Sequence, residues 1–173
     1  GFTHTYTTQS YSHDAERITE ALEDFYRGHT DQSSFMYIHL IPPHGPYMPP
    51  KEFRIFMEAE PDFITPHSQN LTAIDEGRLE ITQRQLDYII AMYDANILFA
   101  DFLTRQIFDY LEERNLLEQT IVIVSSDHGE AFRQHGQMQH NSTVFDEMLH
   151  VPFLIHFPEA LNLRGKRVSE PVS

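Results

Sequence analysis

The chain has 173 residues, of which 40% are hydrophobic and 12% aromatic, a composition that predicts one globular domain or part of one. Its formal net charge is -14 and its 12 Lys and Arg residues form no clusters, so we expect no nucleic-acid partner. The absence of Cys excludes disulfides and thiolate metal sites but leaves the compartment unknown, and no apolar run is long enough to be a membrane segment.

The N-terminal part is expected to contain a loop and then a helix. Residues 1–11 are polar and show no periodicity, which indicates a loosely attached segment. Apolar residues then repeat at helical spacing from Ile18 to Phe25. Asp14 or Ser12 can cap the start of this helix, and Gly28 is placed to end it.

A strand is predicted from Phe35 to Leu40, followed by a proline-rich loop. The five prolines between positions 42 and 50 oppose regular structure, which leaves His44 and Tyr47 on a stiff loop at the carboxyl end of the strand. Residues 51–81 carry no clear periodicity and are expected to form an irregular insertion.

A long helix is predicted after this insertion. Thr82 and Gln85 have the spacing of a capping box, and apolar residues continue at helical spacing to about Arg114. This length is unusual for one helix and leaves room for a break.

The C-terminal third is predicted to contain two further strands. The first, Thr120 to Ser126, includes an uninterrupted β-branched run, as expected of a strand covered on both faces. A loop to about Asn141, a short helix over 142–149 and a strand over 151–157 follow. Strands alternating with helices predict an α/β fold, with a mainly parallel sheet and helices on both faces.

The tetrapeptide that follows the Thr120 to Ser126 strand is a candidate metal site. Parallel sheets bind ligands at the carboxyl ends of their strands, where Asp127 and His128 are expected to lie. An adjacent carboxylate and imidazole can bind one divalent cation if the chain turns sharply, and Gly129 permits that turn. The alternative interpretation is a helix cap, in which Asp127 accepts backbone hydrogen bonds and His128 is merely exposed.

Three blocks of the sequence resemble the sulfatase family of the alkaline phosphatase superfamily, and they follow one another in the order that the family shows. The segment SDHGEAFRQHGQMQHNSTVFDEMLHVPFLIHFP is similar to the family's metal-binding segment, and FMYIHLIPPHGPYMPP is similar to the segment in which a strand delivers a His followed by Pro-Tyr. Between them, QLDYIIAMYDANILFADFLTRQIFDYLEERNLLEQT resembles the family's long helical connection. The resemblance covers nearly the whole chain and implies an alkaline phosphatase-like fold.

The chain lacks two motifs of a complete sulfatase. The family has a strand ending in paired Asp residues and a Cys or Ser, in a Pro-and-Arg motif, that matures to the nucleophile formylglycine; neither is found here. We therefore expect residues 1–173 to be an incomplete portion of a longer catalytic domain, inactive or nearly so alone, with the nucleophile outside it. Self-association through the truncated sheet edge is a further expectation.

The resemblance implies that Asp127 and His128 are ligands of one divalent cation: Ca, Mg, Mn or Zn. Many sulfatases have Asn at the position of His128, and imidazole shifts the preference toward Mn or Zn. The Asp-His pairing also occurs in relatives that process phosphate and phosphonate esters. A phosphoric or phosphonic ester hydrolase or transferase therefore remains an alternative.

Histidines are the implied substrate contacts and catalytic groups. In the family, residues corresponding to His44 and His140 contact the sulfate or protonate the leaving oxygen, and imidazole can do either near neutral pH. Tyr47 and His135 are further candidates for substrate binding. The alternatives are a loop histidine bonded to backbone for His44 and a solvated loop histidine for His140. Glu130 is interpreted as a helix N-terminal carboxylate or a partner of His128.

Taken together, these motifs favour part of a metal-dependent hydrolase of small-molecule or glycan sulfate monoesters. The alternative from another class is a non-catalytic module that binds an anion or a metal at the same strand ends.

Overall fold

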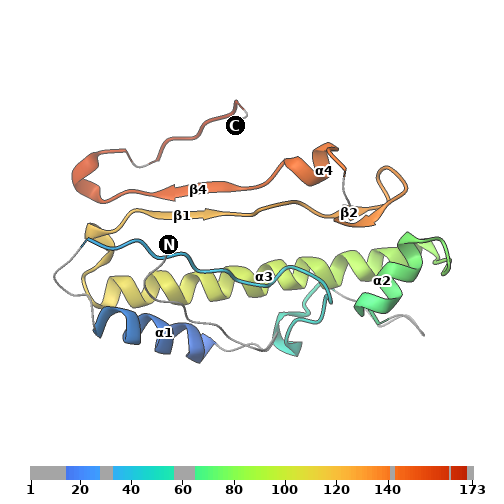
Figure 1. The fold of residues 1–173 in the computed structure, drawn as a ribbon, viewed down its shortest axis with the longest axis horizontal. Helices are drawn as coiled ribbons and strands as arrows, with labels where there is room; N and C mark the ends of the chain where they lie inside the picture. Colours follow the sequence, from blue (N-terminus) through green and yellow to red (C-terminus); the bar gives the residue numbers. More distant parts are fainter. Residues whose placement is uncertain (1–14, 28–32, 57–64, 141–142, 164, 171–173) are drawn as a thin grey trace.

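The computed structural model describes residues 15–27, 33–56, 65–140, 143–163 and 165–170 (Figure 1). Its helices are α1 (Ala15–Arg27), α2 (Ser68–Asp75), α3 (Gln83–Glu113) and α4 (Asp146–Leu149). Its strands are β1 (Val122–Ser125), β2 (Ala131–Phe132), β3 (Met138–Gln139) and β4 (Phe153–His156). Single 3-10 turns are η1 (Lys51–Phe53), η2 (Leu117–Gln119) and η3 (Glu159–Leu161). Within these described ranges no helix has the length and hydropathy needed to cross a bilayer.

Helix α3 is the spine of the molecule, and its start is the predicted one. The Gln85 amide donates to the Thr82 side chain at 3.3 Å, and the Gln85 side chain accepts from the Thr82 amide at 2.8 Å. The helix then continues unbroken for 31 residues and runs most of the length of the molecule (Figure 1). The two ends of α3 therefore lie in different packing environments.

Two apolar clusters hold α3 in place, one near each of its ends. The first joins the N-terminal half of α3 to α2, the proline-rich loop and β3, through buried Tyr47, Leu71, Ile74, Leu86, Tyr88, Ile89, Met92 and Met138. The second joins the C-terminal half of α3 to α1 through buried Leu22, Tyr110 and Leu111. Val122 of β1 packs against this second cluster, so α3 positions β1 as well.

The predicted parallel sheet is not found in the part of the chain that the structure describes. β1 pairs with β4 in antiparallel register, with Val122 opposite His156 and Ser125 opposite Phe153, and β2 pairs with β3 as a short antiparallel hairpin. A parallel neighbour needs a crossover connection, usually a helix. The link from β1 to β4 contains only the hairpin and the one-turn α4, so the chain returns antiparallel.

The prediction of helices on both faces is also wrong for the described part of the chain. α1 and α3 lie on one side of β1 and β4 (Figure 1), and burial along β1 alternates, with Val122 and Val124 half-buried and Ile123 exposed. Residues 33–41 are extended but form no strand. Their apolar pattern was sufficient for an extended conformation, yet a strand also needs pairing with a neighbouring strand, and the described residues pair only as β1 with β4 and β2 with β3.

Other expectations are confirmed in part. The helix containing Ile18 and Phe25 is found as α1, but its proposed caps and residues 1–11 lie outside the described residues. The segment 51–81 was predicted to be irregular, and it contains the turn η1 and the two-turn helix α2. Helix α2 has no side-chain cap bond at its start and only two buried side chains, Leu71 and Ile74, which explains its weak sequence signal.

A pair of isoleucines on α3 tests this packing. Ile89 is fully buried and Ile97 is 45% exposed. We expect Ile89→Ala to lower the free energy of unfolding by about 2–5 kcal/mol, because it removes buried methyl groups and leaves a cavity. Ile97→Ala, the same change on the same helix, should cost less than about 1 kcal/mol. Urea unfolding measures both, and equal losses would contradict the described orientation of α3.

The exposed apolar strands predict association. Ile123 is 58% exposed, and Ile155, which lies opposite it on β4, is 38% exposed. We expect the 173-residue chain to self-associate in light scattering, because a single apolar sheet face and an unpaired strand edge are both costly in water. Ile123→Lys should reduce the association. A strictly monomeric chain at all concentrations would contradict this expectation.

Candidate functional site

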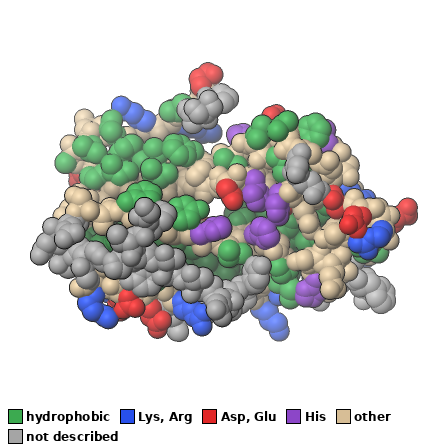
Figure 2. All heavy atoms as spheres, viewed as in Figure 1, with side chains coloured by type: hydrophobic (Ala, Val, Ile, Leu, Met, Phe, Trp, Pro, Cys, Tyr) green, Lys and Arg blue, Asp and Glu red, His purple; other side chains and the backbone are tan. Residues whose placement is uncertain are grey.

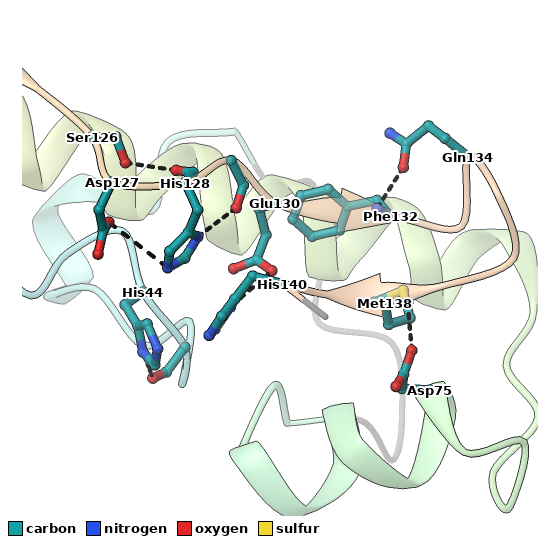
Figure 3. Close-up of polar contacts among 12 residues, drawn as sticks. His44, Asp75, Ser126, Asp127, His128, Glu130, Phe132, Gln134, Met138 and His140 are labelled. Atoms are coloured by element: carbon teal, nitrogen blue, oxygen red, sulfur yellow. Dashed lines mark hydrogen bonds and ion pairs between the residues drawn. The ribbon is translucent and has the colours of Figure 1, made fainter. Parts of the chain in front are cut away.

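The candidate site begins at the end of β1, where two hydrogen bonds and a His–Asp contact shape the turn. The Ser126 hydroxyl donates to the backbone carbonyl of His128 at 2.6 Å. The His128 Nδ1 lies 2.7 Å from the carbonyl of Gly129, which makes it the protonated nitrogen, and Nε2 lies 3.8 Å from Asp127 Oδ1 (Figure 3). Asp127 and His128 therefore lie beside each other in this turn, and a cation shared by the two stays a prediction.

Gly129 lets this turn lie directly against α4. Its amide donates to the Met148 carbonyl at 2.8 Å. A Cβ at position 129 would overlap the backbone carbonyl of Glu147, closer than real Cβ atoms come to other atoms. The glycine is therefore required by a close backbone approach and not, as the sequence suggested, by the turn itself, since Gly129 has no left-handed φ.

Three histidines from separate segments meet beside this turn. The rings of His128 and His140 are stacked with centroids 4.2 Å apart, and the His44 ring lies 4.7 Å from His140 and 6.4 Å from His128. Figure 2 shows histidine side chains gathered near the middle of the face that also carries the apolar surface. His44, Asp127 and His128 line a groove between residues 33–44 and β1.

His44 and His140 are each held by their own loop. His44 Nδ1 lies 2.6 Å from the Gly45 carbonyl, within the proline-rich loop. His140 follows β3, where the Met138 amide donates to the Asp75 carboxylate of α2 at 2.8 Å (Figure 3). Gln139, just before His140, has a φ of 64°, a left-handed conformation that non-glycine residues seldom adopt and that often marks functional sites.

Glu130 places a buried carboxylate behind the histidines. Its side chain is 4% exposed, and Oε1 lies 3.4 Å from His140 Nδ1. Burial raises the pKa of Glu130 above its ordinary value, an effect that the Tyr47 hydroxyl and the charges of His128 and His44 oppose. Burial and then the charges of His128 and His44 lower the pKa of His140. Neutral imidazole is thereby favoured at His140.

A divalent cation would find part of a coordination shell here. No group of three or more His, Cys, Asp or Glu side chains able to hold an ion occurs in the described ranges. Asp127 and His128 nevertheless fit a cation as two donors. The bond from Nδ1–H to the Gly129 carbonyl orients the ring and leaves the Nε2 lone pair beside the carboxylate, as in metal-bound histidines.

Tyr47 occupies the core rather than the groove. It is fully buried and its ring packs against Tyr93 and Phe132, with centroids 5.4 Å and 5.9 Å away. Its hydroxyl is buried and acts on Glu130, whose pKa it lowers. Burial and then the charge of Glu130 raise the pKa of Tyr47. A direct contact between Tyr47 and substrate stays a prediction.

His135 lies on the loop of the β2–β3 hairpin, where it contacts α4 and Phe145, the residue that precedes α4. Its Nδ1 is 2.7 Å from Glu147 Oε1, and its ring stacks on Phe145 with centroids 3.8 Å apart. None of these contacts joins His135 to His44, His128 or His140. Its proposed role in substrate binding also stays a prediction.

Sequence reasoning did not identify two structural supports of the site. Glu130 was interpreted as a partner of His128 or a helix carboxylate, whereas its short contact is with His140. Asp75 was not singled out, because it lies in the segment predicted to be irregular. The apolar positions around Glu130 could have indicated its burial, but the contact between residues 75 and 138 has no local sequence signal.

Comparisons with known proteins agree on one family. The sequence model described as Sulfatase matches residues 2–173. Human arylsulfatase K is 33% identical over 112 residues, which are 65% of this chain and 19% of that protein. The endo-4-O-sulfatase of Bacteroides thetaiotaomicron is 25% identical over 136 residues, which are 78% of this chain and 26% of that protein. The chain thus matches only about a fifth to a quarter of the length of these relatives.

Two glycines test the close approach of the β1 turn to α4. We expect Gly129→Ala to lower the free energy of unfolding by about 1–3 kcal/mol, because the new methyl group displaces the Glu147 backbone. The control is Gly136→Asn. Gly136 has a φ of 78° and nothing within 4 Å of a built Cβ, and Asn tolerates that conformation, so a change under about 0.5 kcal/mol is expected. Urea unfolding that found Gly129→Ala harmless would contradict the contact.

Proposed function

This chain belongs to the sulfatase family, and we propose that it forms part of a metal-dependent sulfatase that hydrolyses sulfate monoesters. The observation that carries the proposal is the convergence of His44, Asp127 and His128 on one groove, with His140 in ring contact with both histidines, from loops as much as 96 residues apart in the chain (140 minus 44). The named relatives are an arylsulfatase and an endo-4-O-sulfatase, which supports a sulfate ester as the substrate class. Small-molecule and glycan esters both remain within that class.

Asp127 and His128 are the proposed ligands of one divalent cation: Ca, Mg, Mn or Zn. A bound cation would polarise an ester oxygen and supply positive charge that this acidic chain otherwise lacks. The two residues are oriented for that role by the bonds of the turn, Ser126 Oγ to the His128 carbonyl and His128 Nδ1 to the Gly129 carbonyl. Further ligands, and the formylglycine nucleophile, would come from outside these 173 residues.

His44 and His140 are the proposed catalytic and substrate-binding histidines. Both rings lie within 6.4 Å of the His128 ring, so both would lie close to an ester that contacts the cation. A neutral imidazole can accept a proton and a protonated one can donate to the leaving oxygen. Tyr47 and His135 are proposed as further substrate contacts. In the structure Tyr47 lies in the apolar core behind the site, and His135 contacts Glu147 of α4.

A second candidate function is suggested by His128. An imidazole at this metal position, where many members of the family have Asn, accords with phosphoric or phosphonic ester hydrolysis or transfer. A non-catalytic module that binds a metal or an anion is the candidate from another class. It would bind the ion without turnover of either ester.

Two substitutions in the full-length protein test these roles. Asp127→Ala should abolish turnover and lower metal content, because it removes a ligand. His44→Ala should retain the metal and lower turnover by about 10²- to 10³-fold, the usual cost of losing a charge-stabilising or proton-transferring group. Both are assayed with an aryl sulfate and an aryl phosphate, alongside metal analysis.

The matched control is His67→Ala, which removes an exposed histidine at the start of α2 whose side chain makes no cap bond. It should have wild-type activity. Preference for the aryl phosphate would support the second candidate. Wild-type turnover in His44→Ala, or full metal content with an intact rate in Asp127→Ala, would contradict the proposed roles.

A further inference from the structure

The buried carboxylate of Glu130 has no assigned role, although it lies directly behind the three histidines. A carboxylate that is 4% exposed is costly to bury, and it persists in proteins when it is paired or does work at a site. Its Oε1 lies within hydrogen-bond distance of His140 Nδ1, at 3.4 Å. Glu130 is therefore placed to act through His140.

The surroundings of Glu130 leave the carboxylate little freedom. The residue lies at the end of the β1 turn, directly after Gly129, whose amide is bonded to the Met148 carbonyl. One side of the Glu130 carboxylate faces the aromatic residues of the core. The charge of Glu130 contributes to raising the pKa of both Tyr47 and Tyr93, to about 12 for Tyr93, after the larger effect of their own burial. Its other side faces the histidines, so its direction is set by the fold.

His140 presents its two ring nitrogens to different surroundings. Nδ1 faces Glu130, and the other nitrogen points away from Glu130 toward the side of His44 (Figure 3). An ionised carboxylate only accepts hydrogen bonds, so the nitrogen that faces it must carry the proton. Stacking on His128 with an interplanar angle of 20° restricts rotation of the ring. Both the tautomer and the plane of the imidazole are then defined.

We propose that Glu130 is a positioning residue: it accepts a hydrogen bond from Nδ1–H of His140 and holds the tautomer whose Nε2 lone pair faces the site. This inference rests on the proposed function in one respect only: the group that Nε2 contacts would be the ester. The assignment of the tautomer itself stands on the geometry of Glu130 and His140. The neighbouring His128 is oriented in the same way, because its Nδ1 bonds to the Gly129 carbonyl.

The first experiment reads the tautomer directly. In the full-length protein with ¹⁵N-labelled histidine, at about pH 8 where free imidazole is neutral, two-bond ¹H–¹⁵N spectra distinguish protonated Nδ1 from protonated Nε2. His140→Gln assigns the signals. We expect the wild type to be protonated at Nδ1 of His140, and Glu130→Gln to shift it toward a mixture, because an amide can donate as well as accept.

A second carboxylate–histidine pair supplies the control for the spectra. Glu147 Oε1 lies 2.7 Å from His135 Nδ1. Glu147→Gln should therefore change the signals of His135 and leave those of His140 unchanged. If Glu130→Gln leaves the His140 tautomer unchanged, the proposal is wrong whatever reaction the protein catalyses.

The kinetic experiment is a double-mutant cycle. Glu130→Gln should lower kcat by about 10- to 100-fold with little change in KM or metal content, as is typical when the partner of a functional histidine is lost. The double variant Glu130→Gln with His140→Ala should be no slower than His140→Ala alone, because Glu130 acts through that ring. Additive losses would overturn the proposal.

A further variant separates positioning from folding. Glu130→Met removes the acceptor and keeps the volume, and replacing a buried charge by an apolar side chain seldom lowers stability. We expect an unchanged or higher Tm together with the same loss of kcat. A rate loss explained by unfolding in both Glu130 variants would overturn the inference. If His140→Ala keeps full activity while the tautomer shift remains, the proposed catalytic role of His140 fails and the positioning by Glu130 stands.

Discussion

The backbone contact between Gly129 and α4 is the constraint on which the rest of the site depends. The Gly129 amide bonds to the Met148 carbonyl, and the absence of a Cβ lets the Glu147 carbonyl lie against the turn. This contact joins the two ends of the segment that connects β1 to β4. It lies between His128 and Glu130 on one side and the segment that leads into β4 on the other. A steric requirement at one residue therefore links the site to the return of the chain as β4.

The electrostatics of the site differ from those of the chain as a whole. A formal net charge of -14 would repel an anionic ester, yet His44 and His128 line the groove, where Asp127 lies exposed beside them. Glu130, by contrast, is buried, and burial raises its pKa. Such a site becomes favourable for an anion once a divalent ion supplies the missing positive charge.

Local signals in the sequence located most elements but not their partners. The capping box at Thr82 and the apolar period of α3 were sufficient to place a helix that the structure shows as unbroken, and the β-branched run was sufficient to place β1. Residues 33–41 have a similar apolar pattern and are extended without being a strand. The difference is that helical hydrogen bonds are made within the segment, whereas a strand depends on a neighbour elsewhere in the sequence. For the same reason the expected parallel sheet was wrong, although two of its three predicted strands are found, as β1 and β4.

Sequence by itself determined the chemical character of the site: Asp127 and His128 after a strand, and His44 on a loop that prolines stiffen. It also determined the family, through motifs that the family comparison confirmed. Only the tertiary structure decided that His44, His128 and His140 share one place, that Tyr47 supports it from the core, and that Glu130 faces His140. The physical reason is that side-chain identity and backbone propensity are local properties. Distances between loops are instead set by the packing of α2 and α3 and by the close approach of Gly129 to α4, which no short stretch of sequence encodes.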